Sequence, residues 1–470
     1  MSDFRNFDIN GIFGNTETVL TPDLFRRFGV ALGSMVKPQG KFIVSFDHRK
    51  SSPQLCSALA QGLRSAGASV VNLGALSVPM AYYAAIRIRA DGCAVVASPY
   101  SSESLNGLQW LVGNAPPDLT QVELLREAAD GRSFRPQESQ DAPEIRTLDV
   151  SYDYVALLQD TWFDSPKMSA NVVIDSKFGS WAGRARRYLQ AVFPKLVFSA
   201  IRDQPNASLA AQCEKGFISQ EIQPLSQAVD RVRADIGFML GEDGARFAVV
   251  DGNGLPLTGD ELNYFVIQSF GASLNNEIFL HDDYCSSVVV AAAVEYGAKP
   301  VTVPPGGTTF LREMVRHNAL LGVESFGKHY FRATCGHSDA LFSICWILDY
   351  LAHLGKTIAM VRKTIPNMLI TPELNIPWEG SESEMGEFLD RFAQKWDRPN
   401  SAIQGVRVDF FDSWIYAGKS IRTDDPALLI RAESVRQNRL AEIIRHCCSA
   451  MDSLESDYGT KLWNQYTRAG

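Results

Sequence analysis

The stretch GFMLGEDGARFAVVDGNGLPLTGDE covers residues 237–261. Several residues of its segment Asp251–Gly254 tolerate positive φ, so this segment predicts a hairpin turn between two apolar runs. Alternate side chains of an extended segment point the same way, so positions 241, 243 and 245 are expected on one face. Asp243 is the single carboxylate on that face, and Glu242 is expected to point to the other.

Short β-rich runs alternate with amphipathic helical segments over most of the chain, which is typical of α/β layers with mainly parallel sheets. The sequence predicts buried or antiparallel strands at 42–46, 69–73, 93–97, 171–175, 195–198, 287–290, 406–410 and 413–416. Helices are expected to open at Thr21-Pro22 and, with a capping box, at Ser51–Gln54. A long helical tail is expected from about Glu433, and residues 453–470 are expected to pack on their own chain, a dimer contact being the alternative.

The bulk composition limits the classes of protein. A chain of 470 residues with 46% apolar and 21% charged residues is expected to form several compact units. A net charge of −8 argues against broad binding of nucleic acid or anionic membranes, while a local basic pocket for phosphate remains compatible with it. No apolar run approaches the roughly 20 residues that span a bilayer. We therefore expect a cytoplasmic protein with no nucleic-acid and no membrane partner.

The eight cysteines include no C-x-x-C pair. They are expected to be reduced and mostly buried. A metal site at His446, Cys447 and Cys448 is the alternative.

Two N-terminal motifs introduce a family resemblance. Residues 4–11, FRNFDING, resemble F-R-A-Y-D-I-R-G of the α-D-phosphohexomutase superfamily (phosphoglucomutase and phosphomannomutase), with Asn10 replacing the arginine. Residues 46–52, which contain Arg49, are similar to G-x-D-x-R-x-S-S. The resemblance covers nearly the whole chain. It implies a four-domain architecture of three α/β mixed-sheet domains and a C-terminal α+β domain around a central cleft, at residues 1–148, 149–256, 257–368 and 369–470.

The phosphoserine loop of the family, T-A-S-H-N-P, falls on residues 96–101, VASPYS. Ser98 takes the place of the serine that carries the transferable phosphate, so the resemblance implies that Ser98 is catalytic. Pro99 and Tyr100 replace the neighbouring histidine and asparagine, and Gln109 replaces a lysine further on. Glutamine cannot exchange a proton near neutral pH, so the acid/base help of the lysine is absent.

The metal loop of the family, D-G-D-A-D-R, can be aligned on Arg246. Its three aspartates then fall on Gly241, Asp243 and Ala245, so Asp243 is the metal ligand that the resemblance implies. Mg²⁺ normally needs more oxygen ligands than one aspartate and water fix firmly. We therefore expect no bound cofactor, with Glu242 and Asp243 as a solvated loop pair. A carboxylate from elsewhere, such as Asp260, is the alternative that would restore binding.

The sugar-recognition loop is better preserved, because residues 322–327, GVESFG, match G-E-E-S-F-G at five of six positions. The family's first glutamate falls on Val323 and its serine on Ser325. The candidate sugar-binding residues are therefore Glu324 and Ser325, and a loop kept for folding alone is the alternative. Lys328 and His329 add nearby donors for a phosphate.

The phosphate clamp R-P-S-(G/N)-T-E-P is matched loosely by residues 418–426, GKSIRTDDP. Ser420 and Thr423 provide hydroxyls, and Lys419 and Arg422 provide positive charge for a phosphate dianion. The adjacent pair 424–425 is acidic and opposes such binding.

These departures lead to two main hypotheses of function. The first is a phosphohexomutase homologue, a pseudoenzyme, that cannot run the Mg²⁺-dependent phosphoryl shuttle and acts as a binding or regulatory protein. Its partners would be a phosphosugar ligand and a protein partner or a second copy of the chain. The alternative is an active hexose-phosphate mutase with a rewired site and a phosphorylated Ser98. A third option is different chemistry in the same cleft, with Tyr100, Lys328 or His329 as the acid or base.

Overall fold

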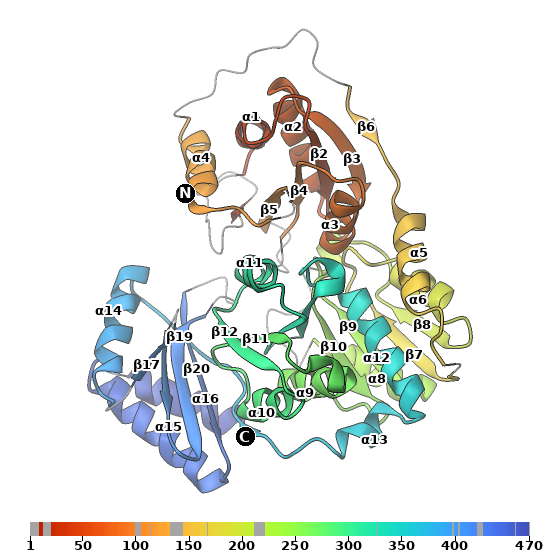
Figure 1. Cartoon of the computed structure of the whole chain (residues 1–470). Coiled ribbons are helices and arrows are strands. Elements are labelled where there is room, and N and C mark those ends of the chain that lie inside the picture. The colour runs from red at the N-terminus through yellow and green to blue at the C-terminus, as the bar shows by residue number, and fades with distance from the viewer. Residues whose placement is uncertain are drawn as a thin grey trace.

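The computed structural model describes residues 9–12, 20–98, 105–113, 115–131, 144–166, 168–210, 221–325, 327–396, 399–402, 405–420, 426–455 and 457–469. Figure 1 shows four sheets, each with helices packed against it, and we call the parts built on them the first to fourth units. The fourth unit lies beside the third, and the first unit lies above both in this view.

The first unit is a six-stranded mixed sheet in the order β1-β5-β4-β2-β3-β6. Its central strands are parallel because helices cross between them, and β5 returns antiparallel to β4. The predicted strands 42–46, 69–73 and 93–97 correspond to β2, β3 and β4. The elements are β1 (Ile9–Ile12), α1 (Pro22–Ser34), β2 (Lys41–Phe46), α2 (Ser52–Ser65), β3 (Ser69–Ala75), α3 (Val78–Arg87), β4 (Gly92–Val96), β5 (Leu105–Val112), α4 (Leu119–Ala129) and β6 (Arg146–Thr147).

The start of α2 differs from the expectation. Thr21 does cap α1, since its side chain accepts a hydrogen bond from the amide of Leu24. Ser51 precedes α2 but makes no capping hydrogen bond with its side chain, so the predicted capping box is wrong. Its hydroxyl instead accepts a hydrogen bond from the amide group of Asn106, at 2.8 Å. A contact distant in sequence therefore replaces the local one.

The second unit is a four-stranded sheet in the order β10-β9-β7-β8. Strand β7 pairs in parallel with β8 and β9, and β10 runs antiparallel to β9. The elements are α5 (Ser151–Thr161), β7 (Asn171–Asp175), α6 (Ala185–Val192), β8 (Val197–Ile201), α7 (Ala207–Ala210), α8 (Gln223–Val232), β9 (Ile236–Leu240) and β10 (Phe247–Asp251). The turn between β9 and β10 contains the predicted metal loop.

The third unit repeats this plan with the order β12-β11-β13-β14, where β14 is antiparallel. Its elements are α9 (Gly259–Phe270), β11 (Ile278–Asp282), α10 (Ser287–Glu295), β12 (Lys299–Val303), α11 (Gly307–His317), β13 (Leu321–Glu324), β14 (Lys328–Phe331), α12 (Ala340–Leu354), α13 (Ile358–Arg362) and the short 3-10 helices η2 (Gly271–Leu274) and η3 (Arg332–Thr334).

The strand predicted at 287–290 is wrong, because these residues begin α10. The hydroxyl of Ser286 accepts a hydrogen bond from the amide of Val288 and caps the helix. Three alanines then continue the run, and alanine is the best helix former. The buried residues Val289, Ala292 and Ala293 follow the helical spacing of three and four.

The fourth unit is an antiparallel sheet with two C-terminal helices. Strand β20 pairs with β15, β16 and β19, and β18 connects β19 to β17. The predicted helical tail begins later than expected, since residues 427–434 complete β20. The elements are β15 (Leu369–Ile370), β16 (Leu374–Pro377), α14 (Glu382–Ala393), β17 (Pro399–Ala402), β18 (Gly405–Asp409), β19 (Ser413–Lys419), β20 (Ala427–Ser434), α15 (Gln437–Asp452) and α16 (Tyr458–Ala469).

The last helix packs on its own chain. Leu462 of α16 is buried, and Trp463 and Tyr466 pack against the same apolar cluster. The cysteines are mostly buried as expected, although Cys335 is exposed. Within the described ranges, no three residues of the metal-ligating types converge around His446 or elsewhere. No helix among those residues is both long and apolar enough to cross a bilayer.

Buried polar contacts join the fourth unit to the third. Arg431 of β20 forms an ion pair with Asp260 of α9 and donates a hydrogen bond to the carbonyl of Tyr284, at 3.0 Å. Glu433 accepts hydrogen bonds from the amide of Ser287, at 2.8 Å, and from its neighbour in the sheet, Trp414. The fourth unit is therefore docked on the third by desolvated charges, which require their partners.

Candidate functional site

Residues 241–246 form a tight turn between β9 and β10. The amide of Gly241 donates to the carbonyl of Arg246, at 2.8 Å, and the amide of Gly244 donates to the carbonyl of Gly241, at 3.1 Å. Gly244 has φ of 88°, which favours glycine. The expectation of an extended segment with 241, 243 and 245 on one face is therefore wrong, because the chain reverses within these six residues.

Three consecutive carbonyl oxygens of this turn bind other parts of the chain. Because these partners come from the first, second and third units, the turn is the point where the three units meet. The carbonyl of Glu242 accepts hydrogen bonds from the amide and the hydroxyl of Ser180, at 3.1 and 2.6 Å. The carbonyl of Asp243 accepts from the amide of Val78, at 3.1 Å. The carbonyl of Gly244 accepts from Trp181 Nε1, at 3.0 Å, and from the amide of Ala340, at 3.2 Å.

The side chain of Glu242 is committed to an ion pair. Its Oε2 lies 3.2 Å from Nη2 of Arg49, and both side chains are 2% exposed. Arg49 also pairs with Asp47 in the same buried group. The expectation that Glu242 and Asp243 form a solvated pair is wrong, since Asp243 is buried as well. Arg49 thus lies at the junction of the first and second units, paired with two carboxylates.

The carboxylate of Asp243 stays within its own turn, where Oδ1 accepts a hydrogen bond from the amide of Ala245 at 3.0 Å. Asp260 does not supply a second ligand, because it is paired with Arg431 and accepts from the amide of Ser286 at 3.1 Å. Mg²⁺ prefers six oxygen ligands in octahedral geometry. With a single carboxylate, the described residues of the turn do not fit a divalent cation.

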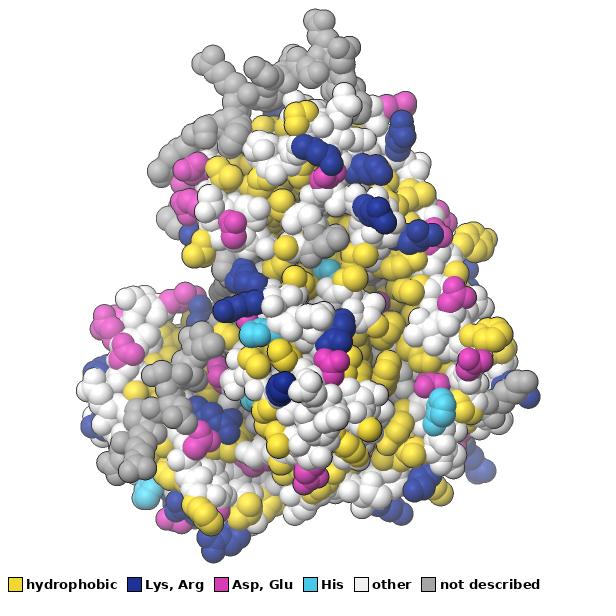
Figure 2. Space-filling view, in the orientation of Figure 1, with side chains coloured by type: hydrophobic (Ala, Val, Ile, Leu, Met, Phe, Trp, Pro, Cys, Tyr) yellow, Lys and Arg dark blue, Asp and Glu magenta, His cyan; other side chains and the backbone are white. Residues whose placement is uncertain are grey.

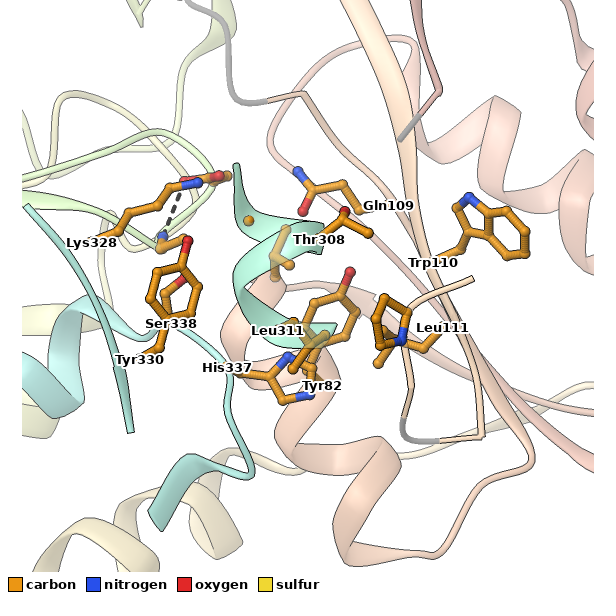
Figure 3. Close-up of a pocket in the computed structure, with 15 residues that line it drawn as sticks. Tyr82, Gln109, Trp110, Leu111, Thr308, Leu311, Lys328, Tyr330, His337 and Ser338 are labelled. Carbon is orange, nitrogen blue, oxygen red and sulfur yellow. Dashed lines mark hydrogen bonds between the residues drawn. The ribbon is translucent and has the colours of Figure 1, made fainter. Parts of the chain in front are cut away.

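A pocket lies between the first and third units, and Asp243 lies in its wall (Figure 3). The space it encloses is about 70 Å³, against roughly 300–1,000 Å³ for sites that hold whole small molecules. The pocket therefore suits one group of a ligand. The lining residues are Val78, Tyr82, Gln109, Trp110, Leu111, Pro116, Asp243, Ala245, Gly307, Thr308, Leu311, Lys328, Tyr330, His337 and Ser338.

Three residues singled out from the sequence, Gln109, Asp243 and Lys328, come together in this pocket. Lys328 begins β14, and its Nζ lies 3.6 Å from the position that a Cβ on Gly307 would occupy. The hydroxyl of Tyr330 lies 3.8 Å from the same position. Lys328 and Tyr330 therefore both meet the first turn of α11.

Glu324 holds that turn in place. Its Oε1 accepts from the amide of Gly306, at 2.6 Å, and its Oε2 accepts from the hydroxyl of Tyr330, at 2.9 Å. Burial raises the pKa of Tyr330, and the Glu324 and Asp243 carboxylates raise it further. Ser325 is also engaged inside the third unit, since its amide and hydroxyl both donate to Asp282 at 2.7 Å. Glu324 and Ser325, the two candidate sugar-binding residues, thus both make their hydrogen bonds within the third unit.

His329 lies in the core and not in the cleft. Its Nε2 is 3.0 Å from Oδ1 of Asn263, and its ring meets Phe247 edge to face. Burial lowers its pKa to about 3, so the ring is neutral near pH 7. The expectation that His329 donates to a phosphate in the cleft is wrong, because the alternation of strand β14 directs this side chain inward while Lys328 points to the pocket.

His337 is a pocket residue that the sequence did not suggest. Its ring packs on Tyr82 of α3, with centroids 4.6 Å apart, so it links the third unit to the first. It is 5% exposed, and its Nε2 has no hydrogen-bond partner among the described residues. The sequence signal that could have indicated His337 as a site residue is its position as a polar residue in the loop between a strand and a capped helix.

The remaining candidates lie apart from this pocket or outside the described residues. Ser98 follows β4, is fully buried and does not line the pocket. Lys419 pairs with Glu382 of α14, and Ser420 is buried at the end of β19. Arg246 folds over Gly241 and is partly buried. Tyr100, Arg422 and Thr423 lie outside the described residues, and Asn10 is described only as a member of β1 opposite Gly107.

Comparison with known families agrees with this architecture. The model described as phosphoglucomutase/phosphomannomutase, alpha/beta/alpha domain I, matches residues 1–121, and the corresponding domain III model matches residues 258–368. A phosphomannomutase/phosphoglucomutase of Pseudomonas aeruginosa is 25% identical over 458 residues, which is 96% of each chain. A probable phosphoglucosamine mutase of Thermococcus gammatolerans is 24% identical over 94% of this chain and 96% of its own.

Solved structures show the same fold over most of the chain. A phosphoglucomutase/phosphomannomutase family protein from Burkholderia thailandensis has a TM-score of 0.81 at 24% identity, with 96% of this chain and 97% of that chain covered. The Paramecium phosphoglucomutase parafusin has a TM-score of 0.68 at 14% identity, with 92% and 91% covered. The fold and cleft therefore define a mixed α/β phosphohexomutase architecture. The chain therefore contains two domains of the phosphoglucomutase/phosphomannomutase family, at residues 1–121 and 258–368, and is similar to members of that family over nearly its whole length.

Proposed function

We propose that this protein binds a hexose phosphate in its cleft, does not run the Mg²⁺-dependent phosphoryl shuttle, and acts as a binding or regulatory protein. The observation that carries the proposal is the buried pair of Arg49 and Glu242, at 3.2 Å. It commits the second carboxylate of the turn, so that Asp243 alone faces the pocket.

Phosphoryl transfer depends chiefly on positioning and on neutralising the charge of the transferred group, which is the contribution of the metal ion. One carboxylate and water do not hold Mg²⁺ firmly. Gln109 lines the pocket where the family has a lysine, and an amide cannot exchange a proton near neutral pH. Both departures lower the rate of the chemical step without removing surfaces that hold a ligand.

The surface of the cleft supports binding of an anion. Figure 2 shows a hollow between the first and fourth units, with basic side chains over α11 beside it. Arg312 and Arg316 belong to this helix. Basic side chains along a cleft raise the local concentration of an anionic ligand, although the chain as a whole carries −8.

The test combines thermal unfolding with turnover. Glucose 1-phosphate or mannose 1-phosphate is expected to raise the melting temperature, because a ligand that binds only the folded state stabilises it. With Mg²⁺ present, no hexose 6-phosphate is expected to form, and intact-mass spectrometry is expected to show no added phosphate. Steady product formation would refute the proposal, as would the absence of any thermal shift with either sugar phosphate.

An active mutase that uses phosphorylated Ser98 is the second candidate. The observation in its favour is that Ser98 is kept at the end of β4, in a chain whose curated relatives named as mutases match over 94–96% of its length. It predicts a fraction of the protein with one phosphate, which a hexose phosphate removes. In that case Ser98→Ala would abolish turnover, whereas turnover unaffected by Ser98→Ala would exclude this mechanism.

A further inference from the structure

We propose that Lys328 supplies the positive charge that a divalent cation would supply beside Asp243, so that the pocket binds the phosphate group of its ligand without a metal. This inference rests on the proposed function and specifies its chemistry. Three features of the pocket and of the turn beside it carry the inference: the space over Gly241 in the turn, the position of Lys328, and the unpartnered nitrogen of His337.

The side chain of Arg246 occupies the space of a first metal ligand. A Cβ added at Gly241 would lie 2.5 Å from Cγ and 3.2 Å from Nε of Arg246. Carbon atoms that are not bonded to each other do not approach to 2.5 Å, since their contact distance is about 3.5–4.0 Å. A carboxylate at position 241 is thus incompatible with this conformation of Arg246, and the turn is closed to a ligand there.

Lys328 enters the pocket from the side of the third unit. In Figure 3 its side chain and that of Gln109 lie on opposite sides of the ribbon of α11, and Thr308 lies near Gln109. Its ammonium group lies 3.6 Å from the Cβ position of Gly307, at the first turn of α11. A lysine ammonium is a compact point charge with three donors, and it suits phosphate oxygens.

The charged groups near this point include a cation of the chain's own. Among the described residues, Asp243 and Glu324 are the carboxylates around the first turn of α11, and Glu324 accepts hydrogen bonds from the amide of Gly306 and the hydroxyl of Tyr330. Lys328 offsets Asp243. The N-terminal end of α11 adds a partial positive charge of about half an elementary charge, which favours an anion.

His337 provides the independent sign that the pocket takes a ligand. His337 lines the pocket and is only 5% exposed. Its Nε2 has no hydrogen-bond partner within the described part of the chain. A buried polar atom without a partner costs about 1–3 kcal/mol. A polar group of a ligand that reaches this end of the pocket, beside Tyr82, would satisfy it.

The experiment measures binding of inorganic phosphate and of glucose 1-phosphate by calorimetry, once with EDTA and once with excess Mg²⁺. The wild type is expected to bind both ligands with the same affinity in the two buffers. Lys328→Met is expected to weaken both by about tenfold or more, since a hydrogen bond to a charged group contributes roughly 1.5–3 kcal/mol. Lys356→Met removes an exposed lysine that does not line the pocket and is the matched control, with unchanged affinity expected.

The outcomes separate a failure of the metal-independent phosphate site from a failure of the proposed function. Binding that EDTA abolishes and Mg²⁺ restores overturns the metal-independent site and leaves the proposed function intact. Phosphate affinity of Lys328→Met equal to that of the wild type overturns the role of Lys328. Failure of the wild type to bind glucose 1-phosphate in both buffers overturns the proposed function and this inference together. The comparison of buffers uses the wild type alone, so it does not depend on the variant folding.

Discussion

Arg49 and Glu242 form an ion pair across the boundary of the first and second units, with 3.2 Å between Nη2 and Oε2. The two residues are separated by 193 positions in the chain. Water is excluded from both side chains, so each charge depends on its partner for the stabilisation that solvent would otherwise give. The pair therefore fixes the turn 241–246 against the first unit.

Glu242→Gln is expected to destabilise the protein by about 1–3 kcal/mol, because it removes one of the two carboxylates with which the buried guanidinium of Arg49 forms ion pairs in the described part of the chain. Thermal unfolding measures the effect as a lower melting temperature. Glu123→Gln is the control, since its pair with Arg126 has side chains 59% and 51% exposed and contributes roughly 0–1 kcal/mol. Equal losses in the two variants would contradict the structural role of the pair.

Ala245→Asp is expected to create a divalent-cation site, because Ala245 lines the pocket beside Asp243. A second carboxylate there repels Asp243, so the melting temperature should fall without metal and recover with Mn²⁺ or Mg²⁺. Gly241→Asp should show no recovery, since Arg246 fills its space. Ala156→Asp adds a charge at an exposed position and serves as the control. An equal response to Mn²⁺ in the wild type would count against the argument.

His337→Phe is expected to reduce the loss of stability at acid pH. Burial lowers the pKa of His337 to about 3, below its ordinary value of 6.5, so the unfolded chain binds the additional proton. Its contribution to stability is complete above pH 6.5 and falls as the pH decreases toward 3. Between pH 8 and pH 5 the wild type should lose on the order of 2 kcal/mol through this residue.

The comparison is a pair of thermal melts at pH 8 and pH 5. The pKa of Asp282 and of Asp339 is raised by burial to about 7 and about 6, so their contributions decrease as the pH rises. Asp282 and Asp339 are present in the wild type and in His337→Phe, so their contributions cancel when the pH dependence of the two proteins is compared. His353→Gln, at a side chain 57% exposed, should behave like the wild type. If His337→Phe shows the same pH dependence as the wild type, the buried neutral state of His337 is wrong.

Arg431→Met is expected to loosen the fourth unit from the third. It leaves Asp260 buried without its cationic partner, a change that typically costs about 3–5 kcal/mol. Limited proteolysis should then cut faster within residues 363–368, which connect α13 of the third unit to β15 of the fourth. Arg436→Met removes a guanidinium 65% exposed in its pair with Asp412 and should leave the cleavage rate unchanged. Equal cleavage in both variants would argue against docking through Arg431.

The strands of the first unit could be predicted from the sequence because they are short apolar runs between turn residues. The runs 42–46, 69–73 and 93–97 all became strands of one sheet. The same signal failed at 287–290, since an apolar run of four residues fits a buried helix equally well. The cap at Ser286 and the alanines that follow decided the outcome there.

The pocket shows a similar division. Gln109, Asp243 and Lys328 were found from local motifs and line one pocket, because each lies at the edge of a strand or in a turn next to the cleft. The partnership of Arg49 with Glu242 and the stacking of His337 on Tyr82 join residues far apart in the chain. Patterns within a short window of sequence carry no information about such pairs.

The turn 241–246 joins three units through main-chain carbonyl groups, which every amino acid possesses. Gly244 is constrained by its own geometry, with φ of 88° and a Cβ position 2.5 Å from Trp181 Nε1, and Glu242 is constrained by its ion pair with Arg49. The carbonyl groups that join the units are thus distinct from the side chains of Asp243 and Ala245 that line the pocket. Asp243 and Ala245 can therefore be exchanged without removing the carbonyl groups that hold the three units together.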